Sequence, residues 1–517
     1  MKKRISSLII LAGFMCMVTA CSDNGRDEQY SQYIDYDSSP TTIVYMTIGD
    51  KPTNGKTEEI IEQLNEILIE RLNARLDVYY IPWTDYLNKY NYVLNDENTK
   101  VDLVGTSTDW LDAWPNVTKG NFYPLTKEML STYCADTFAC VSDEEWEACT
   151  YNDNIYLIPE NEFSQWTNHG FIYRGDWAGQ AGMEEGLHSW DDMTKYFEYV
   201  IENHPEVTPF SADTASVTTA LGYISSTTDY VPIMDITSYE LWGAYKDEPD
   251  KIVSPFYEGQ ELIDFAILMK TWKKMGVFEN FYDVEDINTD ITVKFYSGKS
   301  ACIQHHTNMY IEDRKPNMDI AQPGSNAKFF WFGEENQNLV RTSILHGAMA
   351  VSADSQHPEL ALMVYDLIRN DEECYRLMNY GIEGVQYNIK EDNVYTRPSD
   401  YNTENDSFTL NYWWGRRDEL ELVNFGRDEA AYDLLKSYYE DCAIEYPWEN
   451  IHFDTTDYSN TLSDIENVCN EYLPQICYGK YQGEPEEMVS RFRQALKDAG
   501  FEKLTEFIQK KADEKAK

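Results

Sequence analysis

Aromatic side chains next to carboxylates are the residues of this chain best suited to chemistry, and the chemistry they suit is binding. Asp109 and Trp110 stand together in GTSTDW, and Trp413 and Trp414 stand together in NYWWGRR. Aromatic rings pack against the apolar faces of sugars, and carboxylates or amides bond their hydroxyl groups. These two segments are therefore candidate binding loops. The alternative is that most of the 13 tryptophans pack in the core.

Signatures of the common catalytic and cofactor sites are absent from the chain. It has no HExxH, GxSxG, P-loop, GxGxxG or CxxC segment. His305 and His306 are adjacent, and neighbouring side chains of a strand point to opposite faces, so one metal ion would not take both. We therefore expect no cofactor and no metal. Acidic residues are so abundant that the sequence neither supports nor excludes the pair of catalytic carboxylates that a glycosidase needs. Asp454 and Asp457 leave a calcium site open, although their segment does not match an EF-hand loop.

The N-terminus predicts export and lipidation. A basic start (MKKR) precedes a short apolar run of about 14 residues, and a membrane-spanning helix needs about 20. The run ends in Val-Thr-Ala-Cys21, which resembles a bacterial lipobox. We expect residues 1–20 to be a signal peptide, Cys21 to carry lipid, and the polar residues 21–40 to form a flexible tether.

Composition limits the partners of the folded part. The formal net charge of −48 argues against nucleic acid and anionic lipid surfaces and makes an anionic ligand less favourable. About 475 residues after the tether predict two or three domains. Eight further cysteines (Cys134, Cys140, Cys149, Cys302, Cys374, Cys442, Cys469 and Cys477) leave disulfides and free thiols equally open.

Strands and helices alternate in the first folded stretch. The pattern predicts strands over 41–48, 76–82 and 101–104, with helices over 58–73 and 84–94 between them. This β-α-β-α-β order predicts a parallel sheet, whose ligands sit beyond the carboxyl ends of the strands. Asp109 and Trp110 lie in that position. Helices are also predicted over 262–275, 358–378 and 484–517, the last broken at Ala499 and Gly500.

Several segments, in order, resemble the extracellular solute-binding proteins of bacterial ABC transporters, the family that includes the maltose-binding proteins. The matching segments are YLNKYNYVLNDENTKVDLVGTSTDW (86–110), EWEACTYNDNIYLIP (145–159), YRGDW (173–177), YSGKSACI (296–303), GIEGVQY (381–387) and FRQALKDAGFEKLTEFI (492–508). In the second of them, Asp153 and Asn154 stand where the family usually has Gly and Lys. The last two are similar to a long Gram-positive subgroup with an added C-terminal region.

The resemblance implies two hinge-linked α/β lobes with the ligand in the cleft between them. By analogy the chain crosses between lobes near 155–173, 318–321 and 378–385, so lobe 1 would comprise 41–155 with 318–378 and lobe 2 would comprise 156–317 with 379–517. It also adds candidates to the ligand site. The full set of candidates is Asp109, Trp110, Trp166, His306, Asn308, Glu383, Trp413 and Trp414.

The function that follows is a lipid-anchored binding protein on the outer face of a bacterial, Gram-positive cell membrane. It would act as a monomer that captures a neutral solute and delivers it to ABC permease subunits. The ligand that fits the candidate residues best is an oligosaccharide, and the protein itself would catalyse no reaction. A cell-surface carbohydrate-active enzyme and a peptide-binding or adhesion lipoprotein remain the alternatives.

Overall fold

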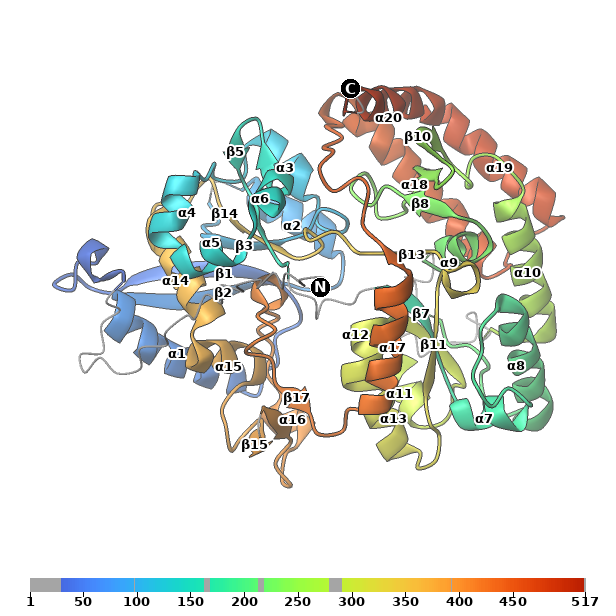
Figure 1. Ribbon diagram of the computed structural model, residues 1–517, viewed down its shortest axis with the longest axis horizontal. Helices are drawn as coiled ribbons and strands as arrows, with labels where there is room; N and C mark the ends of the chain where they lie inside the picture. Colours follow the sequence, from blue (N-terminus) through green and yellow to red (C-terminus); the bar gives the residue numbers. More distant parts are fainter. Residues whose placement is uncertain are drawn as a thin grey trace, which may run out of the picture.

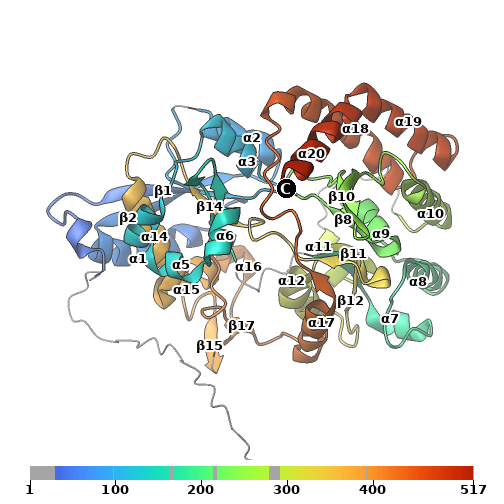
Figure 2. The same cartoon turned by 45° about the horizontal axis from the view of Figure 1, so that its top comes forward.

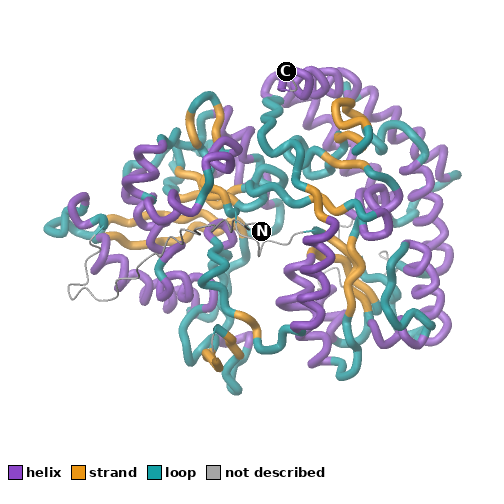
Figure 3. Tube along the Cα trace, in the orientation of Figure 1, coloured by secondary structure: helices purple, strands orange, loops and turns teal. Residues whose placement is uncertain are grey.

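Two α/β lobes stand side by side in the computed structural model, which describes residues 29–96, 98–161, 168–212, 218–278, 291–391 and 393–515 (Figure 1). Strands lie inside each lobe and helices cover them (Figure 3). Trp166 and Cys21 fall outside the described residues. Within the described ranges, no helix is long and apolar enough to cross a membrane.

The sheet of lobe 1 is the parallel core that the sequence predicts. Its strands run in the order β2-β1-β3-β14-β6. β1 pairs in parallel with both β2 and β3, whereas β14 joins the sheet antiparallel. Their bounds are β1 Thr41–Ile48, β2 Ala74–Ile81, β3 Leu103–Thr106, β6 Ile158–Pro159 and β14 Ala348–Val351.

Helices cover this sheet because their apolar residues recur every three or four positions. In α1 the buried side chains include Ile60, Leu64, Leu68 and Leu72, one stripe of the helix. Ser142 caps α6 in a capping box with Glu145. The helices of this lobe are α1 Lys56–Leu72, α2 Tyr86–Leu94, α3 Ala113–Lys119, α4 Lys127–Tyr133, α5 Ala135–Cys140, α6 Asp143–Ala148, α14 Pro358–Asn370, α15 Glu372–Tyr380 and α16 Thr403–Asp406, with short turns η1 Ser31–Tyr33 and η4 Trp413–Gly415. Its remaining strands are β4 Thr150–Tyr151, β5 Asn154–Ile155, β15 Asn388–Glu391, β16 Val394–Thr396 and β17 Val423–Asn424.

Lobe 2 is built on two small antiparallel sheets, ordered β11-β7-β12 and β10-β9-β8. Their strands are β7 His169–Tyr173, β8 Tyr230–Pro232, β9 Gly243–Tyr245, β10 Glu248–Val253, β11 Cys302–His306 and β12 Lys328–Trp331. β13 Leu339–Val340 pairs with β18 Ala443–Ile444. The helices are α7 Gly175–Gln180, α8 Trp190–Asn203, α9 Thr218–Thr227, α10 Glu261–Met275, α11 Ile291–Tyr296, α12 Thr307–Met309, α13 Lys315–Ala321, α17 Glu429–Cys442, α18 Ser459–Cys477, α19 Pro485–Asp498 and α20 Phe501–Lys515, with η2 Tyr310–Arg314, η3 Glu334–Asn336 and η5 Thr456–Tyr458. Figure 2 shows α18, α19 and α20 together on the outside of this lobe.

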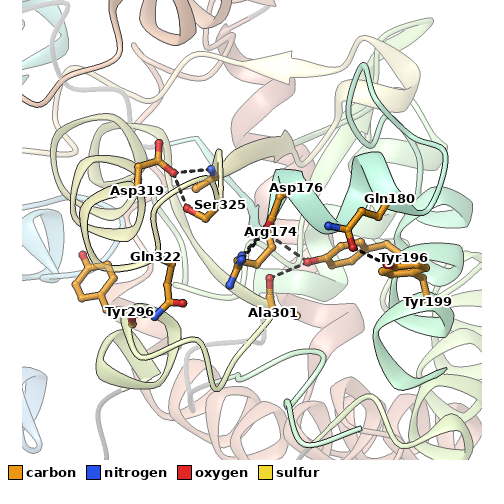
Figure 4. A network of polar contacts seen from close by, with 11 residues as sticks. Arg174, Asp176, Gln180, Tyr196, Tyr199, Tyr296, Ala301, Asp319, Gln322 and Ser325 are labelled. Carbon is orange, nitrogen blue, oxygen red and sulfur yellow. Dashed lines mark hydrogen bonds and ion pairs between the residues drawn. The ribbon is translucent and has the colours of Figure 1, made fainter. Parts of the chain in front are cut away.

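The YRGDW segment joins β7 to α7 through a compact polar network (Figure 4). The Arg174 guanidinium donates to both carboxylate oxygens of Asp176, at 2.9 and 2.6 Å, and lies 4.1 Å from the centre of the Trp177 ring. The Tyr196 hydroxyl accepts from the Arg174 amide at 3.2 Å and donates to the Ala301 carbonyl at 3.0 Å. These bonds fix β7 against β11 and α8, so the motif supports the scaffold of lobe 2.

Two of the predicted lobe crossings differ from the structure. The first crossing lies between β6 and β7, within the predicted range. Residues 318–340 belong to lobe 2 because β12 pairs with β7 and Met318 joins the same core as Ile172. The second crossing therefore lies between β13 and β14.

The third crossing also lies later in the chain than predicted. Leu410, Tyr412 and Trp414 pack in the core of lobe 1, whereas Leu435 and Tyr439 on α17 pack in lobe 2. The chain therefore crosses between β17 and α17. The Trp414 ring, which is fully buried against β3, holds this stretch on lobe 1. The local sequence pattern around 378–385 gives no sign of that packing.

The segment after β18 touches lobe 1 before the chain returns to lobe 2. The His452 ring lies 4.0 Å from the Trp114 ring, centre to centre, and its Nε2 is 2.8 Å from the Thr150 carbonyl oxygen. The Tyr151 hydroxyl donates to Asp454 at 2.8 Å. Asp454 also accepts from the Thr456 amide and hydroxyl. We call residues 449–456 the clasp, because they bond the two lobes without being one of the crossings.

The cysteines form no disulfides among the described residues. The eight cysteines from Cys134 to Cys477 are all free thiols, and six of them are buried. Burial raises the pKa of the Cys149, Cys302 and Cys477 thiols. These thiols therefore act as small apolar core residues.

Candidate functional site

A cavity of about 650 Å³ opens between the lobes. This volume suits a small-molecule ligand. Lobe 1 contributes Trp83, Asp109, Trp110, His346, Gly347, Trp413, Trp414 and Arg416. Lobe 2 contributes Asn168, His169, Thr218, Leu221, Gly222, Ser225, Pro232, Met234, Ser238, Glu240, His305, His306, Asn308, Met309, Phe332, Asn338, Val340 and Thr342.

The lobe 1 wall is a row of tryptophans. The Trp83 and Trp110 rings are stacked at 6.3 Å and 20°, and the Trp110 and Trp414 rings at 5.7 Å and 22°. Trp413 lies 6.0 Å from Trp83, tilted by 33°. Trp414 is fully buried, whereas Trp83 is 44% exposed. The row thus runs from the core into the cavity, where its outermost ring, Trp83, is the most exposed.

Asp109 sits beside this row in a fixed pair with a histidine. Its Oδ2 lies 2.7 Å from His346 Nδ1, and its Oδ1 accepts a hydrogen bond from the Ser107 hydroxyl. Burial lowers the pKa of His346, but the charge and hydrogen bond of Asp109 outweigh burial, so the net pKa is raised. The Trp110 indole donates to the His346 carbonyl at 3.2 Å, which ties the ring to the pair. One carboxylate is thereby held in a single orientation at the cavity wall.

The lobe 2 wall carries a cluster of uncharged histidines. His169 and His305 have parallel rings 6.2 Å apart, and His306 lies edge-on to both at 5.8 and 4.4 Å. Burial lowers the pKa of His169 to about 4 and that of His305 to about 3, and it also lowers the pKa of His306. At neutral pH these imidazoles are neutral donors and acceptors. Among the described residues no group of three or more His, Cys, Asp or Glu side chains could hold a metal ion.

The carboxyl group of Glu240, which lines the cavity, has a raised pKa, and so do those of Asp235 and Glu449, which do not line it. Burial, followed by Asp109 and Asp235, raises the pKa of Glu240 to about 8. Burial likewise raises the pKa of Asp235 to about 7 and that of Glu449 to about 7. Glu449 accepts from the Ser343 hydroxyl at 2.7 Å. The wall is therefore polar, and its charge is lower than its composition suggests.

The structure brings six of the eight predicted ligand residues to this cavity. Asp109, Trp110, His306, Asn308, Trp413 and Trp414 line it. Trp414 is the innermost ring and supports Trp110, so most of its surface faces the core.

Glu383 requires a correction, and Trp166 lies outside the described residues. Glu383 is exposed beside a short bridge to Tyr387 and is not part of the cavity wall. It was selected for its place at an expected crossing, and the chain crosses elsewhere.

Sequence reasoning missed Trp83, His346 and Glu240. Trp83 follows the carboxyl end of β2 just as Trp110 follows β3, so the same strand-end rule would have found it. His346 and Glu240 follow no such rule. Each lies in an irregular segment that only the tertiary structure brings to the cavity.

Known families and proteins resemble this chain in sequence and in fold. A family model described as a domain of unknown function (DUF3502) matches residues 449–517, which hold the clasp and α18 to α20. A carbohydrate ABC transporter substrate-binding protein of Streptococcus pneumoniae is 22% identical over 488 residues, 92% of each chain. This relative confirms the resemblance to ABC transporter solute-binding proteins that the motifs indicated.

Solved structures confirm the two-lobe fold. The N-glycan transport solute binding protein of Streptococcus pneumoniae matches with a TM-score of 0.70 at 18% identity, over 92% of this chain and 98% of that one. The same protein in complex with Man1GlcNAc matches with a TM-score of 0.69 at 17% identity, covering 92% and 99%. An alginate-binding protein without calcium ion matches with a TM-score of 0.64 at 14% identity, covering 92% and 99%.

Proposed function

We propose that this chain is an extracellular solute-binding protein that captures a neutral oligosaccharide and delivers it to an ABC permease. The observation that carries the proposal is the pairing of the two cavity walls. Tryptophan faces on lobe 1 oppose neutral imidazoles, amides and carboxyls on lobe 2. This arrangement suits a ligand with flat apolar faces and many hydroxyl groups. The full-length relative that handles carbohydrate supports the same substrate class.

Capture would work by closure of the lobes. Because both lobes line one cavity, a ligand that contacts both favours the closed arrangement. A saturating oligosaccharide should then reduce the radius of gyration in small-angle scattering. Equal scattering with and without a ligand that binds would argue against hinge closure.

The test of the function is a ligand screen on the lipid-free protein. Thermal shift followed by calorimetric titration should find at least one binder among maltotriose, chitotriose, Man1GlcNAc and longer neutral oligosaccharides. Peptides of similar mass serve as the control for the peptide-binding alternative. The same mixtures, incubated and analysed for products, test the enzyme alternative, because a binding protein returns the sugar unchanged.

We also propose that Cys21 anchors the protein to the outer face of the cell membrane, with the permease subunits as partners. Each buried methylene of an acyl chain contributes about 0.8 kcal/mol of membrane affinity, so two or more chains hold firmly. Cys21→Ala should move the protein to the soluble fraction or leave its signal peptide uncleaved. Normal cleavage with unchanged membrane fractionation would refute the anchor.

A further inference from the structure

Glu240 stands out on the lobe 2 wall because its backbone is held in a conformation that glutamate rarely adopts. Its φ of 51° lies in the left-handed region, where a side chain is disfavoured. Two hydrogen bonds hold this conformation. The Glu240 amide donates to the Thr237 carbonyl at 3.1 Å, and the Tyr230 hydroxyl donates to the Glu240 carbonyl at 3.2 Å. The turn between β8 and β9 thus fixes the direction of one side chain.

That side chain lines the cavity with a carboxyl group that has no partner among the residues the structure describes. Among the described residues, nothing forms a hydrogen bond or ion pair with the Glu240 carboxyl oxygens, in contrast to Asp109, which is bonded twice. Asp109 on lobe 1 and Asp235 on lobe 2 both disfavour its ionised form. The Glu240 side chain is half-buried, and a carboxyl group that loses part of its contact with water without gaining a partner is destabilised. A ligand hydroxyl group would supply the missing hydrogen bond.

We propose that Glu240 is a specificity-determining residue of lobe 2 that hydrogen-bonds one hydroxyl group of the captured saccharide, opposite Asp109 on lobe 1. The proposal rests on the proposed function, since it takes the ligand to be a neutral saccharide. A site that bonds a hydroxyl rejects the analogue that lacks it far more strongly than an apolar pocket rejects a missing methylene, because a buried polar group stays unpaired. Glu240 would therefore distinguish between saccharides that differ at one hydroxyl position.

Glu240→Gly separates a ligand contact from a structural role. Glycine adopts positive φ without strain, and the change removes a half-buried carboxyl that has no partner among the described residues, so the melting temperature should stay level or rise. Affinity for the tightest neutral binder among maltotriose, chitotriose and Man1GlcNAc should fall at least tenfold. The matched control is Asp153→Gly, which removes a carboxylate at a φ of 66° on an exposed turn away from the cavity. It should leave affinity within twofold of wild type.

Singly deoxygenated analogues of that saccharide provide the second measurement. On the wild-type protein, one analogue should bind at least tenfold more weakly than the parent sugar. On Glu240→Gly, the affinities of that analogue and of the parent sugar should lie within threefold of each other. Unchanged affinity of Glu240→Gly, or equal losses in both proteins for every analogue, would overturn the assignment while leaving the proposed function intact. If no saccharide binds wild type, the proposed function fails and the assignment fails with it.

Discussion

The two walls of the cavity are built in opposite ways. On lobe 1 the tryptophan row starts from a fully buried ring and is tied by Trp110 to the Asp109–His346 pair, so its geometry exists before any ligand arrives. On lobe 2 the wall holds neutral histidines and Glu240, a carboxyl group with a raised pKa that has no partner in the described part of the chain. We infer that lobe 1 provides a fixed platform and lobe 2 provides the groups that discriminate between ligands.

Trp414→Ala should produce the largest effect, and on stability rather than on binding. Its ring is fully buried, stacks on Trp110 and donates to Thr47 Oγ1 at 3.4 Å. Removal of a buried tryptophan costs about 3–5 kcal/mol. Chemical denaturation should show a loss of this size. A Trp414→Ala variant with an unchanged free energy of unfolding but no ligand affinity would show instead that Trp414 itself contacts the ligand.

Trp83→Ala tests the outer end of the same row. This ring is 44% exposed, so its removal should leave the melting temperature nearly unchanged. If it stacks on a sugar ring, affinity should drop by about 1–3 kcal/mol, by analogy with bases stacked on aromatic side chains. Calorimetric titration with the best neutral binder measures the loss. Tyr92→Ala, at a ring that is 69% exposed and outside the cavity wall, should change neither property.

How much of this could be read from the sequence differs between the two walls. The β-α-β-α-β pattern predicted the parallel sheet of lobe 1, and the strand-end rule led to Asp109 and Trp110, which line the cavity. Local hydrophobic patterns carry that information because each strand and helix buries its own face. Glu383 failed as a candidate because its selection depended on a crossing point, which only the packing of Trp414 against β3 determines. Glu240 and His346 were missed because irregular segments acquire their direction from tertiary contacts.

The pH dependence of stability tests the lobe 2 wall. The pKa values of Glu240 (about 8), Asp235 (about 7) and Glu449 (about 7) are all raised by burial. A carboxyl with a raised pKa in the native state holds its proton where the unfolded chain has released it. Its contribution to stability is therefore largest at acid pH and is lost as pH rises through the native pKa. His346, with its raised pKa, changes stability in the same direction.

The melting temperature should therefore fall between pH 6.5 and pH 8, by an amount that corresponds to roughly 1–2 kcal/mol. Below pH 6.5 the lowered pKa values of His169, His305 and His306 act in the opposite direction, so the test is confined to the range above it. Glu240→Gln should reduce the slope, whereas Asp153→Asn on an exposed turn should not. A melting temperature that stays flat or rises over this range would contradict the neutral, protonated character assigned to the lobe 2 wall.

The smallest expected effect concerns the clasp, where the two walls are held together. The Tyr151 hydroxyl on lobe 1 donates to Asp454 of the clasp at 2.8 Å. If this bond exists only when the lobes are closed, Tyr151→Phe weakens the closed state by about 0.5–1.5 kcal/mol. Ligand affinity should then fall by roughly 2- to 10-fold although Tyr151 is not part of the cavity wall, because a ligand that needs the closed state binds in proportion to its population. The matched control is Tyr257→Phe, which removes a hydrogen bond of the same length to Glu502 within lobe 2. It should lower stability by a similar amount and leave affinity unchanged.

Equal affinity of both variants would show that the clasp persists when the lobes open. The tryptophan wall of lobe 1 and the polar wall of lobe 2 would then move about a fixed joint at residues 449–456.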